Sequence, residues 1–344
     1  MMTSSIQTIE NINIQRLDLL ATPESLKQDI PLSHNAANTV LSGRQTIKNI
    51  LNGKDNRLLA IVGPCSVHDI SSAKEYAERL KALHDKLADK IYIVMRCYFE
   101  KPRTNIGWKG LINDPNLDGS NDMNSGLRKA REFLAWLADL GLPAATEALD
   151  PVTPQYIADL ISWSAIGART TESQTHREMA SGLSMPVGFK NSTDGSLTAA
   201  VNAIISAQSE HTFIGIDNSG STALLRTKGN PDAHIILRGG KHPNYDVGSI
   251  AECIAELEQS KITPKIIVDA SHGNSGKDHT KQPAVAESVA AQIKSGNSAL
   301  KGIMLESHLK AGNQSLSDNL EYGVSITDSC IDWETTEKLL GSLL

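Results

Sequence analysis

The sequence predicts an α/β fold, a (β/α)8 TIM barrel, and three observations support this. From about residue 56 onwards, short β-rich runs alternate with longer amphipathic segments, which is typical of a parallel sheet covered by helices. The alternation repeats eight times, the number that closes a barrel. No Gly-x-Gly-x-x-Gly turn follows the first strand, so the rival open, doubly wound sheet is less favoured.

Each expected strand is a short run rich in aliphatic and β-branched residues. The strands are expected at Leu58–Val62, Ile91–Cys97, Ala144–Leu149, Ala165–Thr170, Val187–Lys190, His234–Arg238, Lys265–Ala270 and Gly302–Ser307. Amphipathic stretches follow most of them. The helices are expected at Ser71–Ala88, Ser125–Leu140, Pro154–Ser162, Thr175–Gly182, Leu197–Ser209, Val247–Ser260 and Pro283–Ser295, and before the barrel at Pro23–Ile30 and Ser33–Leu51.

Two segments stand outside the barrel pattern. Residues 1–55 are polar, and we interpret them as an N-terminal extension. Before strand six, the runs Phe213–Ile216 and Ala223–Leu225 flank Asn218-Ser219-Gly220, which predicts an inserted β-hairpin. No linker separates these parts from the barrel, so we expect a single domain overall, with residues 56–344 as the catalytic barrel.

Composition excludes several classes of function. Apolar residues make up 40% and charged residues 21% of the chain, as in globular proteins. The net charge of −6 does not favour nucleic acid or an anionic membrane as a partner, and no apolar run is long enough to cross a bilayer. Four widely spaced cysteines argue against a disulfide scaffold and favour a cytoplasmic location.

Six basic residues fall at or just past the carboxyl ends of expected strands, where the active site of such a barrel forms. They are Arg96, Lys101, Arg103, Arg169, Lys190 and Arg238. Like charges that share a cleft repel each other, so this cluster in an acidic chain indicates binding of multivalent anions. Arginine forks bind phosphate and carboxylate bidentately. The alternative is that each side chain pairs with an acid at the barrel rim.

A second group of polar residues lies at or after strands one, seven and eight, which adjoin when the barrel closes. It consists of Cys65, His272, Glu306 and Asp328. A thiolate, an imidazole and two carboxylates suit a borderline first-row divalent ion, which acts as a Lewis acid on a carbonyl oxygen. Taken singly, the cysteine is equally explained as a small core residue and the histidine as a hydrogen-bonding residue.

Four motifs resemble one enzyme family. The runs Met95–Thr104, Gly107–Leu111, Gly167–Ser173 and Glu306–His308 closely resemble those of 3-deoxy-D-arabino-heptulosonate 7-phosphate (DAHP) synthases of the short, feedback-regulated type. The resemblance extends from about Arg16 to Leu340. It implies a transferase that condenses phosphoenolpyruvate with erythrose 4-phosphate, the first step of the shikimate pathway, and that assembles as a homotetramer.

The resemblance also implies roles for individual residues. One divalent ion (Mn, Fe, Co or Zn) would bind the four residues named above. The phosphoenolpyruvate ligands would be Arg96, Arg169, Lys190 and Arg238, and the erythrose 4-phosphate ligands Lys101, Pro102, Arg103 and Thr104. Catalytic roles would fall to Lys101, Glu147, Lys190 and His272, with Glu147 orienting a water molecule. Asn105 and Ser192 depart from the family pattern, but neither removes a charge or a metal ligand.

Feedback inhibition by an aromatic amino acid is a further expectation from the resemblance. The effector residues would be Pro154, Gln155, Leu183, Ser184, Phe213 and Gly215. Gly215 and the stretch Thr146–Pro151 look most like the tyrosine-sensitive branch, so tyrosine is the expected inhibitor and phenylalanine the second choice.

Three alternative functions stay open. A sister synthase that uses arabinose 5-phosphate resembles this barrel but carries Asn-Arg-Ser where this chain has Pro102-Arg103-Thr104. A non-catalytic barrel kept as a regulatory or binding subunit would have lost a ligand or an arginine, and none is lost here. A metal-dependent hydrolase would place several histidines around two metals, whereas only His272 is suitably placed.

Overall fold

Aliphatic runs that end in polar residues form the barrel. The structure, a computed structural model, describes residues 9–343, and its strands close in the order β1-β10-β9-β8-β5-β4-β3-β2, all parallel. The barrel strands are β1 (Leu58–Gly63), β2 (Ile91–Arg96), β3 (Ala144–Glu147), β4 (Trp163–Ile166), β5 (Val187–Lys190), β8 (His234–Leu237), β9 (Ile266–Asp269) and β10 (Leu300–Glu306). The predicted (β/α)8 barrel is confirmed.

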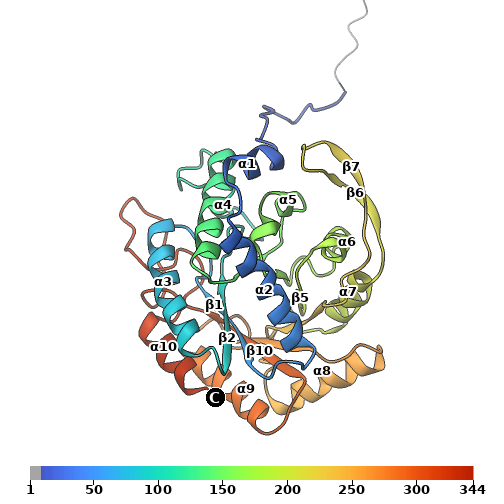
Figure 1. Cartoon of the computed structure of the whole chain (residues 1–344), viewed down its shortest axis with the longest axis vertical. Coiled ribbons are helices and arrows are strands. Elements are labelled where there is room, and N and C mark those ends of the chain that lie inside the picture. The colour runs from blue at the N-terminus through green and yellow to red at the C-terminus, as the bar shows by residue number, and fades with distance from the viewer. Residues whose placement is uncertain (1–8, 344) are drawn as a thin grey trace, which may run out of the picture.

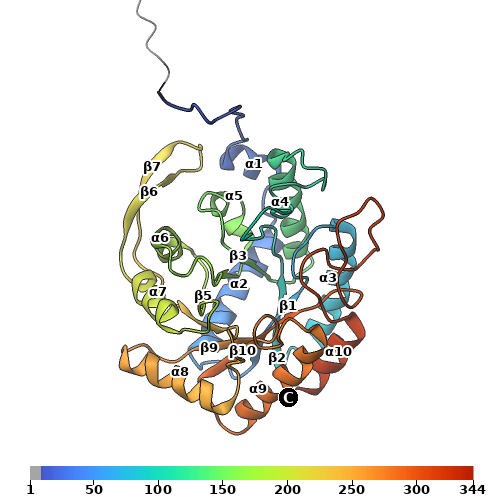
Figure 2. The ribbon, with the colours of Figure 1, turned by 180° about the vertical axis from the view of Figure 1, so that it is seen from behind.

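Helices surround the barrel, as Figures 1 and 2 show from opposite sides. They are α1 (Pro23–Asp29), α2 (His34–Leu51), α3 (Ile70–Lys86), α4 (Met123–Asp139), α5 (Pro154–Ile157), α6 (Gln174–Gly182), α7 (Thr198–Gln208), α8 (Val247–Gln259), α9 (Gln282–Lys294) and α10 (Trp333–Ser342), with 3₁₀ turns η1 (Ala158–Leu160) and η2 (His279–Lys281). No helix within residues 9–343 is long and apolar enough to cross a membrane.

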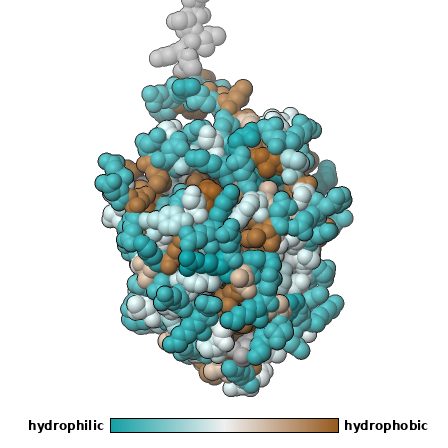
Figure 3. Space-filling view, turned by 60° about the vertical axis from the view of Figure 1, so that its left-hand side comes forward, coloured by the Kyte–Doolittle hydropathy of each residue, from teal (hydrophilic) through white to brown (hydrophobic). Residues whose placement is uncertain are grey.

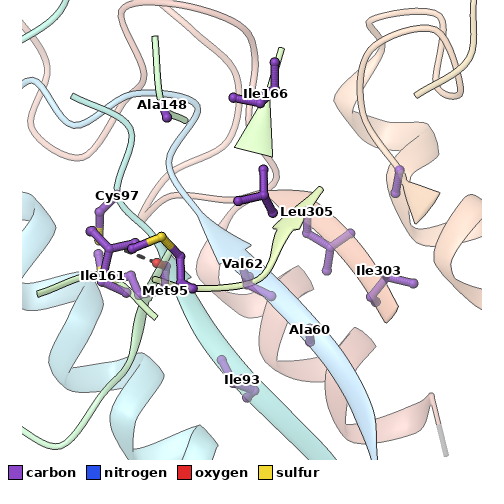
Figure 4. Packing of buried hydrophobic residues seen from close by; sticks show 14 of the residues in the cluster. Ala60, Val62, Ile93, Met95, Cys97, Ala148, Ile161, Ile166, Ile303 and Leu305 are labelled. Atoms are coloured by element: carbon purple, nitrogen blue, oxygen red, sulfur yellow. Dashed lines mark hydrogen bonds between the residues drawn. The ribbon is translucent and has the colours of Figure 1, made fainter. Parts of the chain in front are cut away.

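The side chains of each strand alternate between two apolar clusters. In β1, Leu59 and Ile61 belong to the cluster that fills the barrel interior. Ala60 and Val62 belong instead to the larger cluster between strands and helices, where Figure 4 shows Val62 near Leu305. All six residues of β1 are buried, as expected for a parallel strand covered on both faces.

The helix α2 closes the amino-terminal end of the barrel. Its apolar side chains Ile47, Ile50 and Leu51 join the interior cluster. Arg44 of the same helix donates hydrogen bonds from Nε and Nη2 to the carbonyl oxygens of Ile161 and Ala158, just before β4 begins. Helix α2 therefore covers the end of the barrel opposite the one where the carboxyl ends of the strands lie.

The predicted hairpin is confirmed and lies outside the barrel (Figure 1). It consists of β6 (Thr212–Ile216) and β7 (Thr222–Arg226), paired antiparallel. Its turn contacts the N-terminal extension, because Glu24 N donates to Asn218 O over 2.7 Å and Lys27 Nζ to Asn218 Oδ1 over 2.9 Å. The two segments that the sequence set apart from the barrel are thus joined to each other.

Two expected elements differ in the structure, and one helix was not expected. The strand expected at Ala165–Thr170 is β4, which ends at Ile166, because Thr170 N bonds back to Gly167 O and turns the chain. The helix expected at Pro154–Ser162 is only the short α5 followed by η1. Helix α10 was not predicted, although Asp332 precedes it and accepts a capping hydrogen bond from Thr335 N over 2.8 Å.

Candidate functional site

A large cavity opens at the carboxyl ends of the strands and has a volume of about 1050 Å³. All six basic residues that the sequence predicted there line it: Arg96, Lys101, Arg103, Arg169, Lys190 and Arg238. Pro102, Thr104, Glu147, His272 and Asp328 line it as well. The closing of the barrel therefore brings together every residue expected to bind a substrate.

Sequence reasoning missed three further lysines on the cavity wall, Lys241, Lys277 and Lys281. Among the described residues the only carboxylates on this wall are Glu147 and Asp328. The site is thus strongly cationic in a chain whose net charge is −6. The lysines could have been predicted from the sequence, because they lie in the segments that follow β8 and β9.

Arg96, at the end of β2, lies at the cavity floor with only 1% of its surface exposed. Its Nη2 donates to Glu306 Oε1 over 2.9 Å, and its guanidinium lies 3.7 Å from the centre of the Tyr98 ring. The Nη1 atom is buried and has no hydrogen-bond partner within residues 9–343. A buried unpaired donor is costly, so this atom is positioned for a ligand oxygen.

Lys190, Asp269 and His272 form a hydrogen-bonded group. Asp269 Oδ2 lies 2.8 Å from Lys190 Nζ and 3.0 Å from His272 Nδ1. Burial disfavours a charged Asp269, but His272 and Lys190 outweigh this effect and hold the pKa of Asp269 well below its ordinary value. Asp269 thereby orients both neighbours, a role that the sequence analysis did not assign to it.

Three of the four expected metal ligands converge. The ligand atoms of Cys65, Glu306 and Asp328 all lie within 4.8 Å of one another. His272 is not in that group, although its Nε2 lies 3.9 Å from Glu306 Oε1. His272 has a left-handed backbone with φ 56°, which is uncommon outside glycine and sets the direction of its ring.

Charges of both signs lie close to Cys65. Lys101 Nζ lies 3.1 Å from Cys65 Sγ. Burial raises the pKa of the Cys65 thiol, and Glu306 raises it further, while Lys101 acts in the opposite direction. Burial also acts to lower the pKa of Lys101, but Cys65 and Glu306 outweigh it, so the pKa of Lys101 lies above its ordinary value.

Glu147, at the end of β3, lies on the cavity wall and is buried. Its Oε1 has no hydrogen-bond partner among the described residues. Gly167 leaves room for this carboxyl group, because a Cβ atom there would lie 2.2 Å from Glu147 Oε1. Any larger residue at this position would displace Glu147 from the wall.

The residues expected to bind an effector lie away from the barrel mouth. Pro154 and Leu183 line a separate cavity of only about 20 Å³. Phe213 and Gly215 lie on β6, and the base of that hairpin is joined to α6 through Ser181 Oγ and Thr227 Oγ1, 2.7 Å apart. Gln155 belongs to α5, and Ser184 follows α6 and is exposed. The cavity that Pro154 and Leu183 line within residues 9–343 is thus smaller than an amino acid.

Comparison with known proteins gives consistent matches. A family model described as the DAHP synthetase I family matches residues 27–341. The chain is 57% identical over 335 residues to the phospho-2-dehydro-3-deoxyheptonate aldolase, Tyr-sensitive, of Escherichia coli (strain K12), covering 96% of this chain and 94% of that protein. Identity to the Phe-sensitive protein of the same strain is 53% over 336 residues, covering 97% and 96%. A solved phospho-2-dehydro-3-deoxyheptonate aldolase from Francisella tularensis SCHU S4 has a TM-score of 0.95 at 51% identity, covering 96% of this chain and 97% of that chain.

Proposed function

The chain belongs to the DAHP synthetase I family, and from this membership we propose how its barrel mouth binds phosphoenolpyruvate and erythrose 4-phosphate. The chain is a transferase, a 3-deoxy-7-phosphoheptulonate synthase, which condenses these two substrates to DAHP and phosphate. The observation that supports the proposed binding mode is the cation-lined cavity, which adjoins the cluster of Cys65, Glu306 and Asp328.

Phosphoenolpyruvate binds at the cavity floor in this proposal. The free Nη1 of Arg96 and the ammonium of Lys190 hold its carboxylate side. Arg169 and Arg238 line the same cavity and neutralise its phosphate group. The pairing of Lys190 with Asp269 keeps the ammonium group in place before the substrate arrives.

Erythrose 4-phosphate binds nearer the rim, at the turn Lys101–Thr104. Arg103 is exposed, and its Nε is held by the carbonyl oxygen of Trp108 over 2.7 Å. This contact leaves the outer edge of the guanidinium free to bind a phosphate. The rim position places the aldehyde end of the substrate toward the floor, where phosphoenolpyruvate lies.

The reaction joins C3 of phosphoenolpyruvate to the aldehyde carbon of erythrose 4-phosphate. Water adds at C2, and phosphate leaves by cleavage of its C–O bond. Glu147, with its unpartnered Oε1 on the cavity wall, orients the water in this proposal. Arg169 and Arg238 stabilise the charge on the departing phosphate, so positioning and charge stabilisation supply most of the rate.

One divalent ion (Mn, Fe, Co or Zn) is part of the proposal. Cys65, His272, Glu306 and Asp328 offer sulfur, nitrogen and oxygen donors, a mixed set that suits such an ion, and the proximity of three of them supports this fit. When bound, the ion supplies a Lewis acid for the aldehyde oxygen. Asp269 holds the His272 ring at Nδ1, which leaves Nε2 directed toward Glu306.

We propose tyrosine as the feedback inhibitor, with phenylalanine as the second choice. The higher identity to the Tyr-sensitive relative than to the Phe-sensitive one supports this order. The expected effector region contains Pro154, Leu183 and the strand β6. Its cavity of about 20 Å³ is too small for an amino acid, so binding there requires movement of α5 or the hairpin, or completion by a second copy.

Self-association, as a homotetramer, is also proposed. Apolar side chains are exposed along the N-terminal segment at Ile12, Leu17 and Leu19, and on the hairpin at Ile214 and Leu224. Figure 3 shows apolar residues on the segment that adjoins the grey N-terminal residues. Such patches mark interaction surfaces.

A cytoplasmic location is also proposed, and it agrees with four cysteines that are all free.

The test is an assay of the purified, Mn²⁺-loaded protein with both substrates. We expect consumption of phosphoenolpyruvate and release of phosphate with erythrose 4-phosphate, and loss of both after treatment with a chelator. Arabinose 5-phosphate in place of erythrose 4-phosphate is the control, and equal turnover with it would assign the chain to the sister synthase. Absence of turnover with either sugar phosphate contradicts the proposed function.

A further inference from the structure

The backbone of Arg238 and Gly239, directly after β8, is held by contacts from the surrounding segments. Asn191, after β5, accepts a hydrogen bond at Oδ1 from Arg238 N over 2.8 Å and donates from Nδ2 to Gly239 O over 3.0 Å. Asn244 accepts at Oδ1 from Gly239 N over 2.7 Å. Gly273 N, after β9, donates to Arg238 O over 3.0 Å. Every polar backbone group of Arg238 and Gly239 therefore has a partner beyond these two residues.

The asparagines that make these contacts are also bonded to one another. Asn244 Nδ2 donates to Asn191 Oδ1 over 3.3 Å, and Asn244 N donates to Asn274 Oδ1 over 2.8 Å. Asn274, after β9, donates from Nδ2 to Leu237 O over 3.1 Å and to Asp269 O over 2.9 Å. An asparagine carries a donor and an acceptor on one short side chain, as a bridge between a backbone N–H and a carbonyl oxygen requires. The three amides thus connect the carboxyl ends of β5, β8 and β9.

Glycines allow the segments to approach this closely. Gly239 has φ 73°, in the left-handed region, and a Cβ atom there would lie 2.5 Å from Asn274 N. A Cβ atom on Gly240 would lie 2.3 Å from Gly195 N, in the segment after β5. The three segments therefore pack backbone against backbone, which leaves the Arg238–Gly239 peptide little freedom to rotate.

The position of this backbone determines where the Arg238 guanidinium lies. Arg238 Nη1 donates to Gly239 O over 3.2 Å, the same oxygen that Asn191 Nδ2 contacts. Burial lowers the pKa of Arg238, Asp269 opposes this effect, and the like charge of Arg169 adds to it. Two arginines that share a cavity repel each other until an anion binds between them. The bond to Gly239 O gives the guanidinium a fixed partner in the absence of that anion.

We propose that Asn191 and Asn244 are positioning residues that fix the Arg238–Gly239 backbone and so place the Arg238 guanidinium for the phosphate group of phosphoenolpyruvate. Neither asparagine is among the described residues that line the cavity, so both act through Arg238. An arginine that is ordered in advance loses less freedom when it binds an anion, and binding is tighter by that difference. This inference rests on the proposed function and adds the residues that determine affinity for one phosphate group.

A buried asparagine at the other end of β8 provides a matched control. Asn230 precedes β8, and its Nδ2 donates to Leu183 O over 3.2 Å and to Met185 O over 2.9 Å. Its Oδ1 accepts from Asp232 N over 3.1 Å. Asn230 thus joins segments in the same way as Asn191, but at the amino end of the strand. Asn230→Ala should lower stability without weakening the binding of phosphoenolpyruvate.

The experiment compares the full-length, Mn²⁺-loaded chain with Asn191→Ala, Asn244→Ala and Asn230→Ala. Both Michaelis constants are measured, together with the inhibition constant of inorganic phosphate against phosphoenolpyruvate. We expect Asn191→Ala and Asn244→Ala each to raise the KM for phosphoenolpyruvate and the inhibition constant of phosphate roughly tenfold, the effect of one lost hydrogen bond to a charged group. The KM for erythrose 4-phosphate should stay within about twofold, because its proposed ligands lie at the Lys101–Thr104 turn.

A double-variant cycle tests whether Asn244 acts through Arg238. The dissociation constant of phosphoenolpyruvate is measured by titration calorimetry, which does not depend on turnover. Arg238→Ala removes the guanidinium, so adding Asn244→Ala to it should change this constant by less than about twofold. If the effects of the two substitutions multiply instead, Asn244 does not act through Arg238, and the positioning role is overturned.

Urea unfolding of each variant separates positioning from a loss of stability. The positioning role is also overturned if Asn191→Ala and Asn244→Ala keep the parent constants, or if Asn230→Ala raises the KM for phosphoenolpyruvate as much as they do. Asn244 is only half-buried, so its variant decides the question if Asn191→Ala does not fold. A parent chain that does not turn over erythrose 4-phosphate refutes the proposed function instead, and the calorimetric cycle then still decides whether Asn244 positions Arg238.

Discussion

Lys190 Nζ lies 2.8 Å from Asp269 Oδ2, and both side chains are almost completely buried. Asp269→Ala leaves the Lys190 charge without its partner, which we expect to lower the free energy of unfolding by roughly 3–5 kcal/mol. The KM for phosphoenolpyruvate should rise as well. Urea unfolding and steady-state kinetics measure the two effects. The control is the double variant Lys190→Met/Asp269→Leu, in which most of the stability should return while activity stays lost. An Asp269→Ala variant that is as stable as its parent would contradict the expectation.

Arg103→Ala should weaken binding of erythrose 4-phosphate far more than that of phosphoenolpyruvate. A lost charge-assisted phosphate contact costs roughly 1.5–3 kcal/mol, which corresponds to about a tenfold to hundredfold rise in KM when KM reports binding. Arg79→Ala on α3, which removes an exposed cation paired with Glu75, is the control and should change neither constant. Equal effects of Arg103→Ala on both Michaelis constants would show that the turn is not specific for one substrate.

Metal binding should release a proton and tighten as the pH rises. Burial raises the pKa of the Cys65 thiol, with Glu306 adding to the effect, so the thiol keeps its proton at neutral pH. A metal ligand must be the thiolate, and the ion therefore displaces this proton. Titration calorimetry in buffers of different protonation enthalpy should give about one proton released per ion. Cys65→Ser should lose this release, and an affinity of the parent that is independent of pH would contradict the assignment.

Stability should fall at mildly acidic pH because of His234. Its Nε2 accepts from Trp163 Nε1 over 3.1 Å, and its Nδ1 bonds to Asp232 O, so the buried ring is neutral. Burial lowers the pKa of His234 to about 4. An unfolded histidine has a pKa of about 6.5, so unfolding takes up a proton at pH values between the folded and the unfolded pKa. Within this range, each unit by which the pH falls lowers the free energy of unfolding by about 1.4 kcal/mol.

The measurement is urea unfolding followed by tryptophan fluorescence from pH 7 to pH 4.5. His234→Gln removes the titrating group, and its stability should depend on pH with a slope smaller by one proton than that of the parent. Identical slopes in the two proteins would show that His234 does not contribute.

Removal of residues 1–30 should abolish inhibition by tyrosine and leave some condensation activity. The extension contacts both parts of the expected effector region, because Glu24 and Lys27 bind Asn218 of the hairpin turn and Tyr156 Oη donates to Ala21 O over 2.8 Å. The inhibition constant for tyrosine is measured before and after truncation. A truncated chain that stays fully sensitive places the inhibitor elsewhere.

The sequence predicted those parts of the fold that follow from local pattern. Strand β1 was expected at Leu58–Val62 and is found at Leu58–Gly63, because a buried parallel strand is a continuous aliphatic run. The end of β4 was misplaced, since Ala165–Thr170 is also apolar and β-branched at intervals, and a hydrogen bond from Thr170 N to Gly167 O decides where the strand stops. Local composition does not reveal which of two conformations such a segment adopts.

For the site, too, the features that follow from local pattern could be predicted, and those that depend on tertiary contacts could not. Basic residues at strand ends could be assigned to one cavity because barrel closure brings all such ends together. The bond between Lys190 and Asp269 could not, because the partners are 79 residues apart and meet only through the packing of β5, β8 and β9. The direction of the His272 ring likewise depends on the left-handed backbone conformation of this residue, which cannot be predicted from its being a histidine.

Helix α2 covers the end of the barrel opposite the substrate cavity. Ile47, Ile50 and Leu51 fill that end, and the cavity that binds both substrates in our proposal opens at the other end. Arg96 lies at the floor with 1% of its surface exposed, while Arg103 lies exposed at the rim. In the proposed binding mode, erythrose 4-phosphate at the rim covers phosphoenolpyruvate at the floor, and we therefore expect phosphoenolpyruvate to bind first.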